Sequence, residues 1–137
     1  MFKLSSKPLE KLNLSKTFHL DSAGAFVSFE GRVRNDHQGK KVIALTYEAA
    51  PELCQKEAQK ILNEVKKKFD VIDIYCFHRV GRLKVGETAI RVGVLSSHRD
   101  AGFKACRYIV DEVKKRVPIW KKEHFFDTSS HWVNCHD

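Results

Sequence analysis

Two stretches in which apolar residues recur at helical spacing, each lying between strand-like runs, constrain this fold most. The first begins at Pro51, because proline lacks the N–H that the first helical position leaves unpaired. The second follows Ser97, which has Asp100 three residues later as in a capping box, so Ser97 is predicted as its N-cap and Pro118 as its stop. The apolar positions are Leu53, Cys54, Ala58, Ile61, Leu62, Val65 and Phe69 in the first stretch, and Phe103, Cys106, Val110, Val113 and Val117 in the second.

The remaining chain consists mostly of runs with the alternation or the β-branched and aromatic content of strands. These runs are residues 23–34, 42–49, 71–80, 88–97 and 119–125, with shorter candidates at 2–4 and 131–133. The main runs and the two helices follow the order β-β-α-β-β-α-β. That order predicts an α+β fold, a two-layer sandwich in which the helices cover one face of a mainly antiparallel sheet.

The length of 137 residues is typical of one domain, so residues 1–137 are expected to form a single unit. No apolar run approaches the roughly 20 residues needed to span a bilayer. The first sixteen residues also lack the apolar core of a signal peptide. We therefore expect a soluble, cytoplasmic protein without a membrane partner.

The cysteines indicate neither a zinc site nor a disulfide framework, because no two of them are close in the sequence. They are Cys54, Cys76, Cys106 and Cys135. Cys54 and Cys106 fall on the apolar helix faces and should fill the core. Metal binding by Cys135 with His131 and His136 stays open but lacks the usual ligand spacing, so no metal site is predicted.

The chain is basic, with 25 Lys and Arg against 17 Asp and Glu and a net charge of +8. An anionic partner or ligand is therefore expected, although charge alone does not separate nucleic acid, a phosphate ester, an acidic protein and simple solubility. Half of the excess positive charge lies between His98 and Glu123, a stretch that contains eight basic and four acidic residues.

His98 and Arg99 occupy the predicted first positions of the second helix, where cations oppose the helix dipole by about 0.3–1 kcal/mol each. They are either solvated at that small cost or form an anion site with the free backbone N–H groups. Arg34, at the end of a strand and opposite in parity to its apolar face, is a weaker candidate. His78 and Arg79 lie at the end of another strand, and for them a structural role is favoured.

A basic cluster surrounds Pro118 and Trp120, and its members are Lys114, Lys115, Arg116, Lys121 and Lys122. Cations are favoured at a helix C-terminus in any case, so a solvated helix end is one interpretation. The other is a functional site, because the cluster continues beyond Pro118 into a strand where no such preference applies.

Lys114 lies sixteen residues beyond His98 on one helix, a separation of about 24 Å along the axis. One chain cannot bring both to the same small ligand. If both serve one site, that site must be shared between two copies, as a two-fold dimer allows.

Several motifs in order resemble the family of large, catalytic subunits of molybdopterin synthase. They are FEGRVRN, LTYEAAPE, FHRVGRLKVGE, VLSSHRDAGFKACRYIVDEVKKRVPIWKKE and the later Trp132, and they extend from about Gly24 to Trp132. The resemblance implies an α/β-hammerhead fold and a heterotetramer with a central homodimer. It also implies a small ubiquitin-like partner whose Gly-Gly C-terminus carries a thiocarboxylate.

The activity implied is that of a sulfurtransferase without a cofactor. It transfers sulfur from the small subunit to cyclic pyranopterin monophosphate and forms the dithiolene of molybdopterin, in molybdenum cofactor biosynthesis. By the resemblance, Lys114 and Lys121 are catalytic. The substrate-binding residues it implies are Arg32, Val33, Arg34, Lys114, Lys121, Lys122 and Glu123, with His98 and Arg99 from the neighbouring copy.

The alternative is a basic α+β module that binds nucleic acid without enzymatic activity. Such sheets usually expose aromatic rings for base stacking. Here the candidates Phe26, Phe29, Tyr75 and Phe77 lie in apolar strands and are expected in the core. A scaffold dimer without activity is a third possibility, which the presence of Lys114 and Lys121 disfavours.

Overall fold

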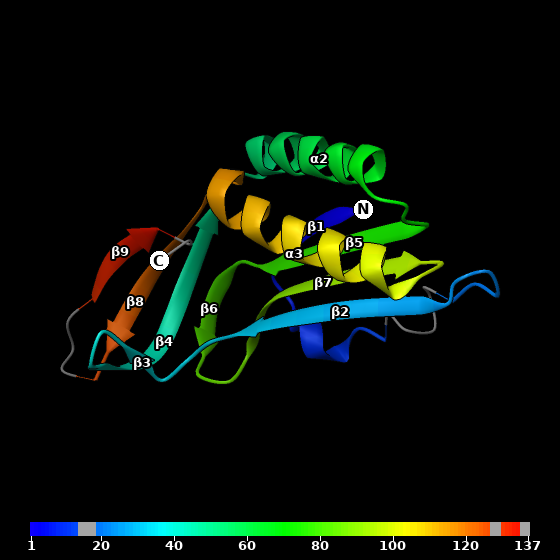
Figure 1. Ribbon diagram of the computed structural model, residues 1–137. Coiled ribbons are helices and arrows are strands. Elements are labelled where there is room, and N and C mark those ends of the chain that lie inside the picture. Colours follow the sequence, from blue (N-terminus) through cyan, green and yellow to red (C-terminus); the bar gives the residue numbers. More distant parts are fainter. Residues whose placement is uncertain (14–18, 127–129, 135–137) are drawn as a thin grey trace.

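The computed structural model describes residues 1–13, 19–126 and 130–134 (Figure 1). Its helices are the 3₁₀ turn η1 (Leu9–Lys11), α2 (Pro51–Lys68) and α3 (Arg99–Arg116). Its strands are β1 (Phe2–Ser5), β2 (Ala25–Arg32), β3 (Asp36–His37), β4 (Lys40–Ala49), β5 (Asp73–Arg79), β6 (Gly81–Lys84), β7 (Thr88–Ser96), β8 (Ile119–Phe125) and β9 (Ser130–Asn134). Both predicted helices and all predicted strands are present. None of the helices described is long and apolar enough to cross a membrane.

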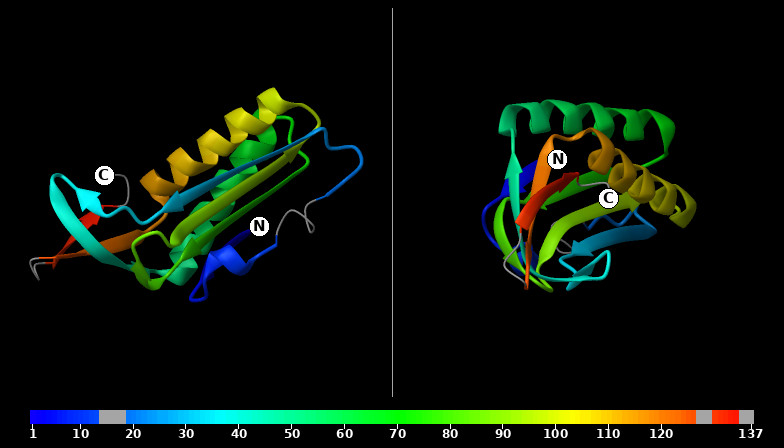
Figure 2. Two further views of the ribbon diagram at one scale, coloured as in Figure 1. Left: turned by 90° about the horizontal axis from the view of Figure 1, so that it is seen from below. Right: turned by 90° about the vertical axis from the view of Figure 1, so that its left-hand side faces the viewer.

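The strands form two sheets rather than one. The first has the order β1-β5-β7-β2, and the second has the order β3-β4-β8-β9 with β6 on β4. Only the pairing of β1 with β5 is parallel among the described strands. Helices α2 and α3 lie over the same face of the first sheet, as Figures 1 and 2 show. The α+β sandwich with a mainly antiparallel arrangement is confirmed.

The main core lies between the two helices and the first sheet. Its fully buried side chains include Ile61, Leu62 and Val65 of α2, Ile109 of α3, and Ile74, Val92 and Val94 of the sheet. Cys54 and Cys106 are buried in this core as predicted, and burial raises the pKa of the Cys106 thiol to about 11. These thiols act as small apolar groups rather than as nucleophiles.

A second, smaller cluster covers the opposite face of the first sheet. It comprises Leu9, Tyr75, Phe77 and Leu95. The guanidinium of Arg91 holds this N-terminal segment in place by donating to the backbone oxygens of Leu9 and Leu12 at 3.0 and 2.8 Å. Gly93 provides the space for Tyr75, because a Cβ there would lie 2.1 Å from the ring.

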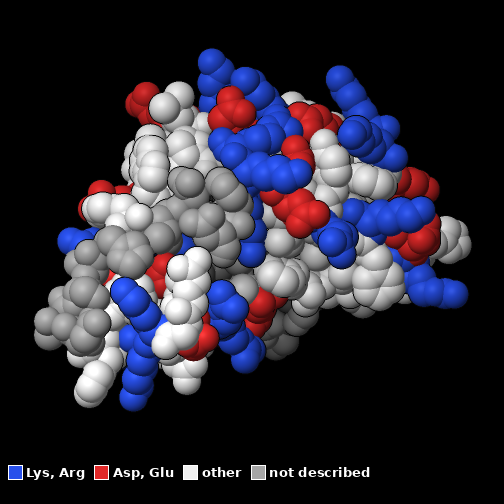
Figure 3. Space-filling view, turned by 60° about the vertical axis from the view of Figure 1, so that its left-hand side comes forward, with Lys and Arg blue, Asp and Glu red and all other residues white. Residues whose placement is uncertain are grey.

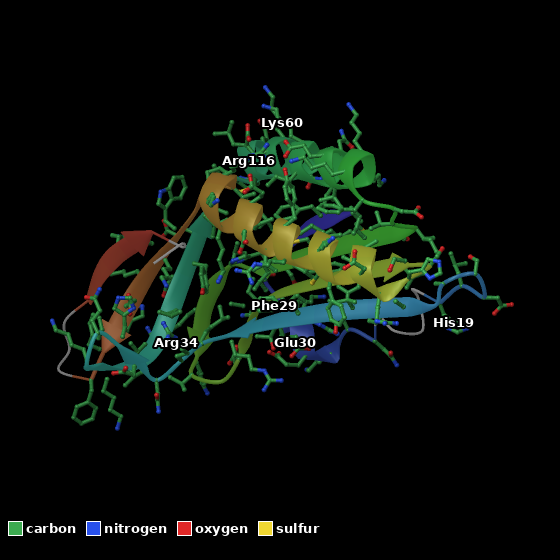
Figure 4. All side chains as sticks on the ribbon, in the orientation of Figure 1. His19, Phe29, Glu30, Arg34, Lys60 and Arg116 are labelled. Atoms are coloured by element: carbon green, nitrogen blue, oxygen red, sulfur yellow. The ribbon has the colours of Figure 1, made fainter. Side chains whose placement is uncertain are left out.

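Glu64 of α2 links the two helices near the C-terminal end of α3. Its carboxylate accepts a bond at 2.8 Å from each terminal nitrogen of Arg116 and one at 2.5 Å from the Tyr108 hydroxyl. Arg116 lies under α2 in Figure 4. These bonds lower the pKa of Glu64 to about 2, the contact with Arg116 being the largest cause. The link fixes the last turn of α3, on which Lys114 is carried.

The predicted capping box at Ser97 is wrong. The N-cap is His98, without a side-chain capping bond, and α3 starts at Arg99. The neighbouring Ser96 hydroxyl donates to the His98 backbone oxygen at 2.7 Å, so the local serine bond is made one residue earlier.

Three apolar side chains expected in the core are exposed instead. Leu53 is 57% exposed, Phe103 62% and Phe26 39%. The predicted burial of Tyr75 and Phe77 is confirmed, and Phe29 is partly buried against the main core.

Candidate functional site

A cavity of about 210 Å³ lies where the C-terminal end of α3 meets both sheets. Its walls come from the end of β2, the β3–β4 hairpin, β5, β7, the last turn of α3 and β8. The cations that line it are Arg32, Arg34, Lys114 and Lys121, and the acids are Asp36 and Glu123. Figure 3 shows several groups of basic side chains on the face turned to the viewer, with acidic ones between them.

Strand β8 divides the basic cluster between two faces. Ile119, Lys121 and Glu123 line the cavity, as the alternation of a strand requires. Lys122 is on the other face, where its ammonium lies 5.9 Å from the centre of the exposed Trp132 ring. The structure therefore separates Lys122 from the cavity with which the resemblance associates it.

Lys114 enters the cavity from the last turn of α3, beside Val113. The helix ends at Arg116 because Pro118 follows, and Val117 closes the last turn with a bond to the Val113 oxygen at 3.1 Å. This stop brings β8, and Lys121 with it, back past the end of the helix. Lys114 and Lys121 are thus seven residues apart and line one cavity.

The two arginines reach the cavity from the end of β2. The register of β2 on β7 shifts between Gly31 and Arg32, and the Val33 side chain beyond them is buried. Val33 donates to the Glu87 backbone oxygen at 3.0 Å and accepts from the Gly86 N–H at 2.8 Å. Val33 therefore anchors the backbone and does not line the cavity, whereas Arg34 lies exposed beside β4 (Figure 4).

Glu123 is the most deeply buried charged group of the cavity, at 1% exposed. Its Oε1 atom accepts no hydrogen bond from the described residues. The nearest basic group described is Nδ1 of His37, at 3.5 Å. A buried carboxylate is costly unless it is paired, so the cavity holds a strong acceptor that is incompletely satisfied.

His78 of β5 also lines the cavity, and its ring meets Tyr47 edge to face at 4.9 Å. Its Nδ1–H donates to the Arg79 backbone oxygen at 2.8 Å, which leaves Nε2 as the acceptor of a neutral ring. Burial lowers the pKa of His78 to about 4, and the charge of Lys114 adds to the decrease. His78 is therefore buried and bonded to the backbone, as its predicted structural role requires, and it also lines the cavity.

His98 and Arg99 do not reach this cavity within one chain. They lie at the N-terminal end of α3, whereas Lys114 is in its last turn. Tyr47, Asp36 and His37, in contrast, line the cavity without having been singled out from the sequence. The pattern of a basic pair at a strand end did draw attention to His78, but nothing in the sequence distinguished the other three.

The arrangement is suited to an anion with several charged or polar groups. Guanidinium and ammonium groups bind phosphate and carboxylate strongly where water is restricted. Among the described residues, no three His, Cys, Asp or Glu side chains lie close enough to hold a metal ion. The His131 side chain, Cys135 and His136 lie outside the described part of the chain.

Comparisons with known proteins give a consistent result. The family described as MoaE protein matches residues 4–116. The molybdopterin synthase catalytic subunit of Thermoplasma volcanium is 39% identical over 129 residues, covering 94% of each chain. That of Pyrococcus abyssi is 44% identical over 133 residues, covering 95% of this chain and 88% of the relative.

Solved structures agree with these relatives. Molybdopterin synthase from Staphylococcus aureus superimposes with a TM-score of 0.89 at 31% identity, covering 96% of each chain. A chain from the complex of subunits 1 and 2 of molybdopterin-converting factor from Helicobacter pylori has a TM-score of 0.79. It covers 96% of this chain and 89% of that one, and at 18% identity it shows likeness of fold alone.

Proposed function

Because the chain belongs to the MoaE family of molybdopterin synthase catalytic subunits, we propose that it forms the dithiolene of molybdopterin. It is a sulfur-transferring enzyme of molybdenum cofactor biosynthesis. The sulfur comes from the thiocarboxylated Gly-Gly C-terminus of a small ubiquitin-like subunit, and the acceptor is cyclic pyranopterin monophosphate. The alternative of a nucleic-acid-binding module has no support from the family.

The observation that carries the assignment of the site is the single cavity lined by Arg34, Lys114 and Lys121. Both reactants are anionic, one through its phosphate and the other through its thiocarboxylate. In this proposal Arg34 binds the phosphate, since its planar guanidinium can donate two parallel bonds to the oxygens. Arg32 contributes charge at the rim, where it is already paired with Glu30 at 3.1 Å.

Lys114 and Lys121 are proposed as the catalytic residues. Their ammonium groups can hold the thiocarboxylate and stabilise the negative charge that develops on the atom to which the electrons of the attacked carbon's broken bond move. Glu123 lies two residues beyond Lys121 on the same face of β8, where its carboxylate can orient an ammonium group. Val33 and Lys122 are left out of this set, since the Val33 side chain is in the core and Lys122 is on the outer face.

The second half of the substrate site is proposed to come from another copy of the chain. His98 and Arg99 are separated from Lys114 by about 24 Å along α3 and cannot act in the same cavity as their own Lys114. A two-fold dimer would bring these two residues of each copy to the cavity of the other. With one small subunit for each cavity, the assembly is a heterotetramer.

The proposal needs no cofactor, because the sulfur arrives on the partner subunit. We also propose that residues 1–137 act as one domain and that the reaction takes place in the cytoplasm. Both are supported by relatives that match nearly the whole chain and act in a pathway of small-molecule synthesis.

Reconstitution tests the proposal directly. The purified chain is incubated with thiocarboxylated small subunit and cyclic pyranopterin monophosphate, and the dithiolene product is measured. Lys114→Ala should fold, bind the small subunit and lose at least about 100-fold in turnover, as expected when a group that stabilises transition-state charge is removed.

Lys104→Ala is the matched control, because Lys104 is an exposed lysine of the same helix that pairs with Asp100 at 3.0 Å. It should keep the activity of the unsubstituted chain. Absence of product from the unsubstituted chain would overturn the proposed function. Full turnover by Lys114→Ala would remove that lysine from the mechanism.

A further inference from the structure

The segment from Arg34 to His37 is held by backbone bonds at Val33 and Asn35 and by the short hairpin that follows. At one end, Val33 is fixed by its two backbone bonds to Gly86 and Glu87. Neither Arg34 nor Asp36 has a side-chain hydrogen bond or ion pair with any other described residue. The position of Arg34 therefore depends on the backbone on either side of it and on how the hairpin beyond is held.

The far end is a tight hairpin. Strand β3 has two residues, and Gln38 and Gly39 form the turn to β4 with φ angles of 51° and 80°. Two consecutive residues with positive φ are typical of a turn that joins closely paired strands. Asp36 and His37 pair with β4, the Val42 N–H donates to the Asn35 backbone oxygen at 2.9 Å, and β3 is an edge strand of its sheet. The backbone alone gives this hairpin little support.

One side-chain contact joins the hairpin to the wall of the cavity. Nδ1 of His37 lies 3.5 Å from Oε1 of Glu123, and both side chains are nearly buried, at 12% and 2% exposed. That oxygen accepts no hydrogen bond within the described structure, and the ring of His37 is its nearest basic group. Both residues line the cavity together with Arg34. A buried carboxylate with a free acceptor atom favours a neighbouring N–H strongly.

We propose that His37 is a positioning residue, whose contact with Glu123 ties the β3–β4 hairpin to β8 and thereby sets Arg34 over the cavity. The inference rests on the proposed function, in which Arg34 binds the substrate phosphate. Loss of the contact weakens substrate binding, because the hairpin beside Arg34 is then held to the sheet by its backbone bonds alone. The catalytic lysines are carried by α3 and β8 and stay in place.

The first test measures kinetics in the reconstituted synthase with cyclic pyranopterin monophosphate as the varied substrate. His37→Leu keeps the bulk of the side chain and removes its N–H. It should raise KM about fivefold, the size of effect expected for one lost polar contact, with kcat changed less than about twofold. His37→Asn, which places an amide N–H near the position of Nδ1, should restore KM.

The second test needs no activity. Trypsin should cleave the isolated chain after Lys40 and Lys41 several-fold faster in His37→Leu, because the freed hairpin opens locally. His19→Leu is the control for both tests. His19 is an exposed histidine whose ring lies 3.8 Å from Asp21, at the end of the molecule opposite Arg34 (Figure 4).

The outcomes distinguish the positioning role of His37 from the proposed function of the protein. An unchanged KM in His37→Leu, a fall in kcat alone, or failure of His37→Asn to restore KM overturns the positioning role. Unchanged proteolysis overturns the contact itself. A wild-type chain that makes no product refutes the proposed function, and the proteolysis still decides whether His37 holds the hairpin.

Discussion

Lowering the pH should destabilise this fold through one residue in particular, the buried His78. Burial and the charge of Lys114 lower its pKa from an ordinary value near 6.5 to about 4. Between these values the unfolded chain binds a proton that the folded chain does not bind, so the stability of the fold falls as the pH falls. Above about pH 6.5 both states are neutral and His78 contributes no pH dependence.

The difference between the two pKa values corresponds to about 3 kcal/mol in the free energy of unfolding, most of it lost by about pH 4.5. The assay is urea unfolding followed by circular dichroism at about pH 7.5 and pH 4.5, at one protein concentration because the proposed dimer would make stability depend on concentration. The comparison is with His78→Asn, whose amide can still donate to the Arg79 oxygen and does not titrate.

The wild-type chain should lose about 2–3 kcal/mol more than His78→Asn over this pH interval. The difference between the two proteins isolates His78 from the carboxylates that titrate in the same range. His19→Asn, which removes an exposed histidine, should leave the pH dependence unchanged. Equal losses in wild type and His78→Asn would refute the burial of a neutral imidazole at this position.

Two further predictions concern the parts of the fold that support the cavity. Glu64, whose pKa is lowered to about 2 by Arg116, stabilises the fold above its ordinary pKa near 4.5, and this contribution is lost as the pH falls toward 2. Glu64→Gln should therefore lower the thermal midpoint at neutral pH and reduce the loss between pH 4.5 and 2; equal curves would contradict this. Gly93→Ala should cost about 2–3 kcal/mol in urea unfolding, because its Cβ would lie 2.1 Å from the buried Tyr75 ring; a cost below 0.5 kcal/mol would contradict it.

Periodicity in the sequence predicted the helices and strands well, because each has a local cause. Pro51 begins α2, Pro118 follows α3, and the alternation in residues 23–34 continues in β2. The division into two sheets has no such local signal. Strand β4 pairs with β8, which lies some seventy residues later in the chain, and periodicity carries no information on pairing at that distance.

The spacing of apolar residues also did not predict which of their side chains are exposed to solvent. Phe103 and Leu53 have the correct spacing for a buried stripe, yet both are exposed, because burial depends on which element covers that part of the helix. The N-cap was misplaced for a similar reason. Ser96 and Ser97 are adjacent in the sequence. Only the path of the backbone determines which of the two hydroxyls forms the hydrogen bond to the His98 oxygen.

The candidate site was predictable to the extent that its chemistry is concentrated in sequence. Lys114 and Lys121 lie close together in the chain, and the alternation of β8 places Lys121 and Glu123 on one face and Lys122 on the other. His37 could not be found in this way. It is a histidine in a turn-like stretch, and it gains a role only because the hairpin brings its ring to a carboxylate 86 positions later in the sequence. A site assembled from several elements thus shows its charge in the sequence, whereas the contacts that orient that charge emerge only from the fold.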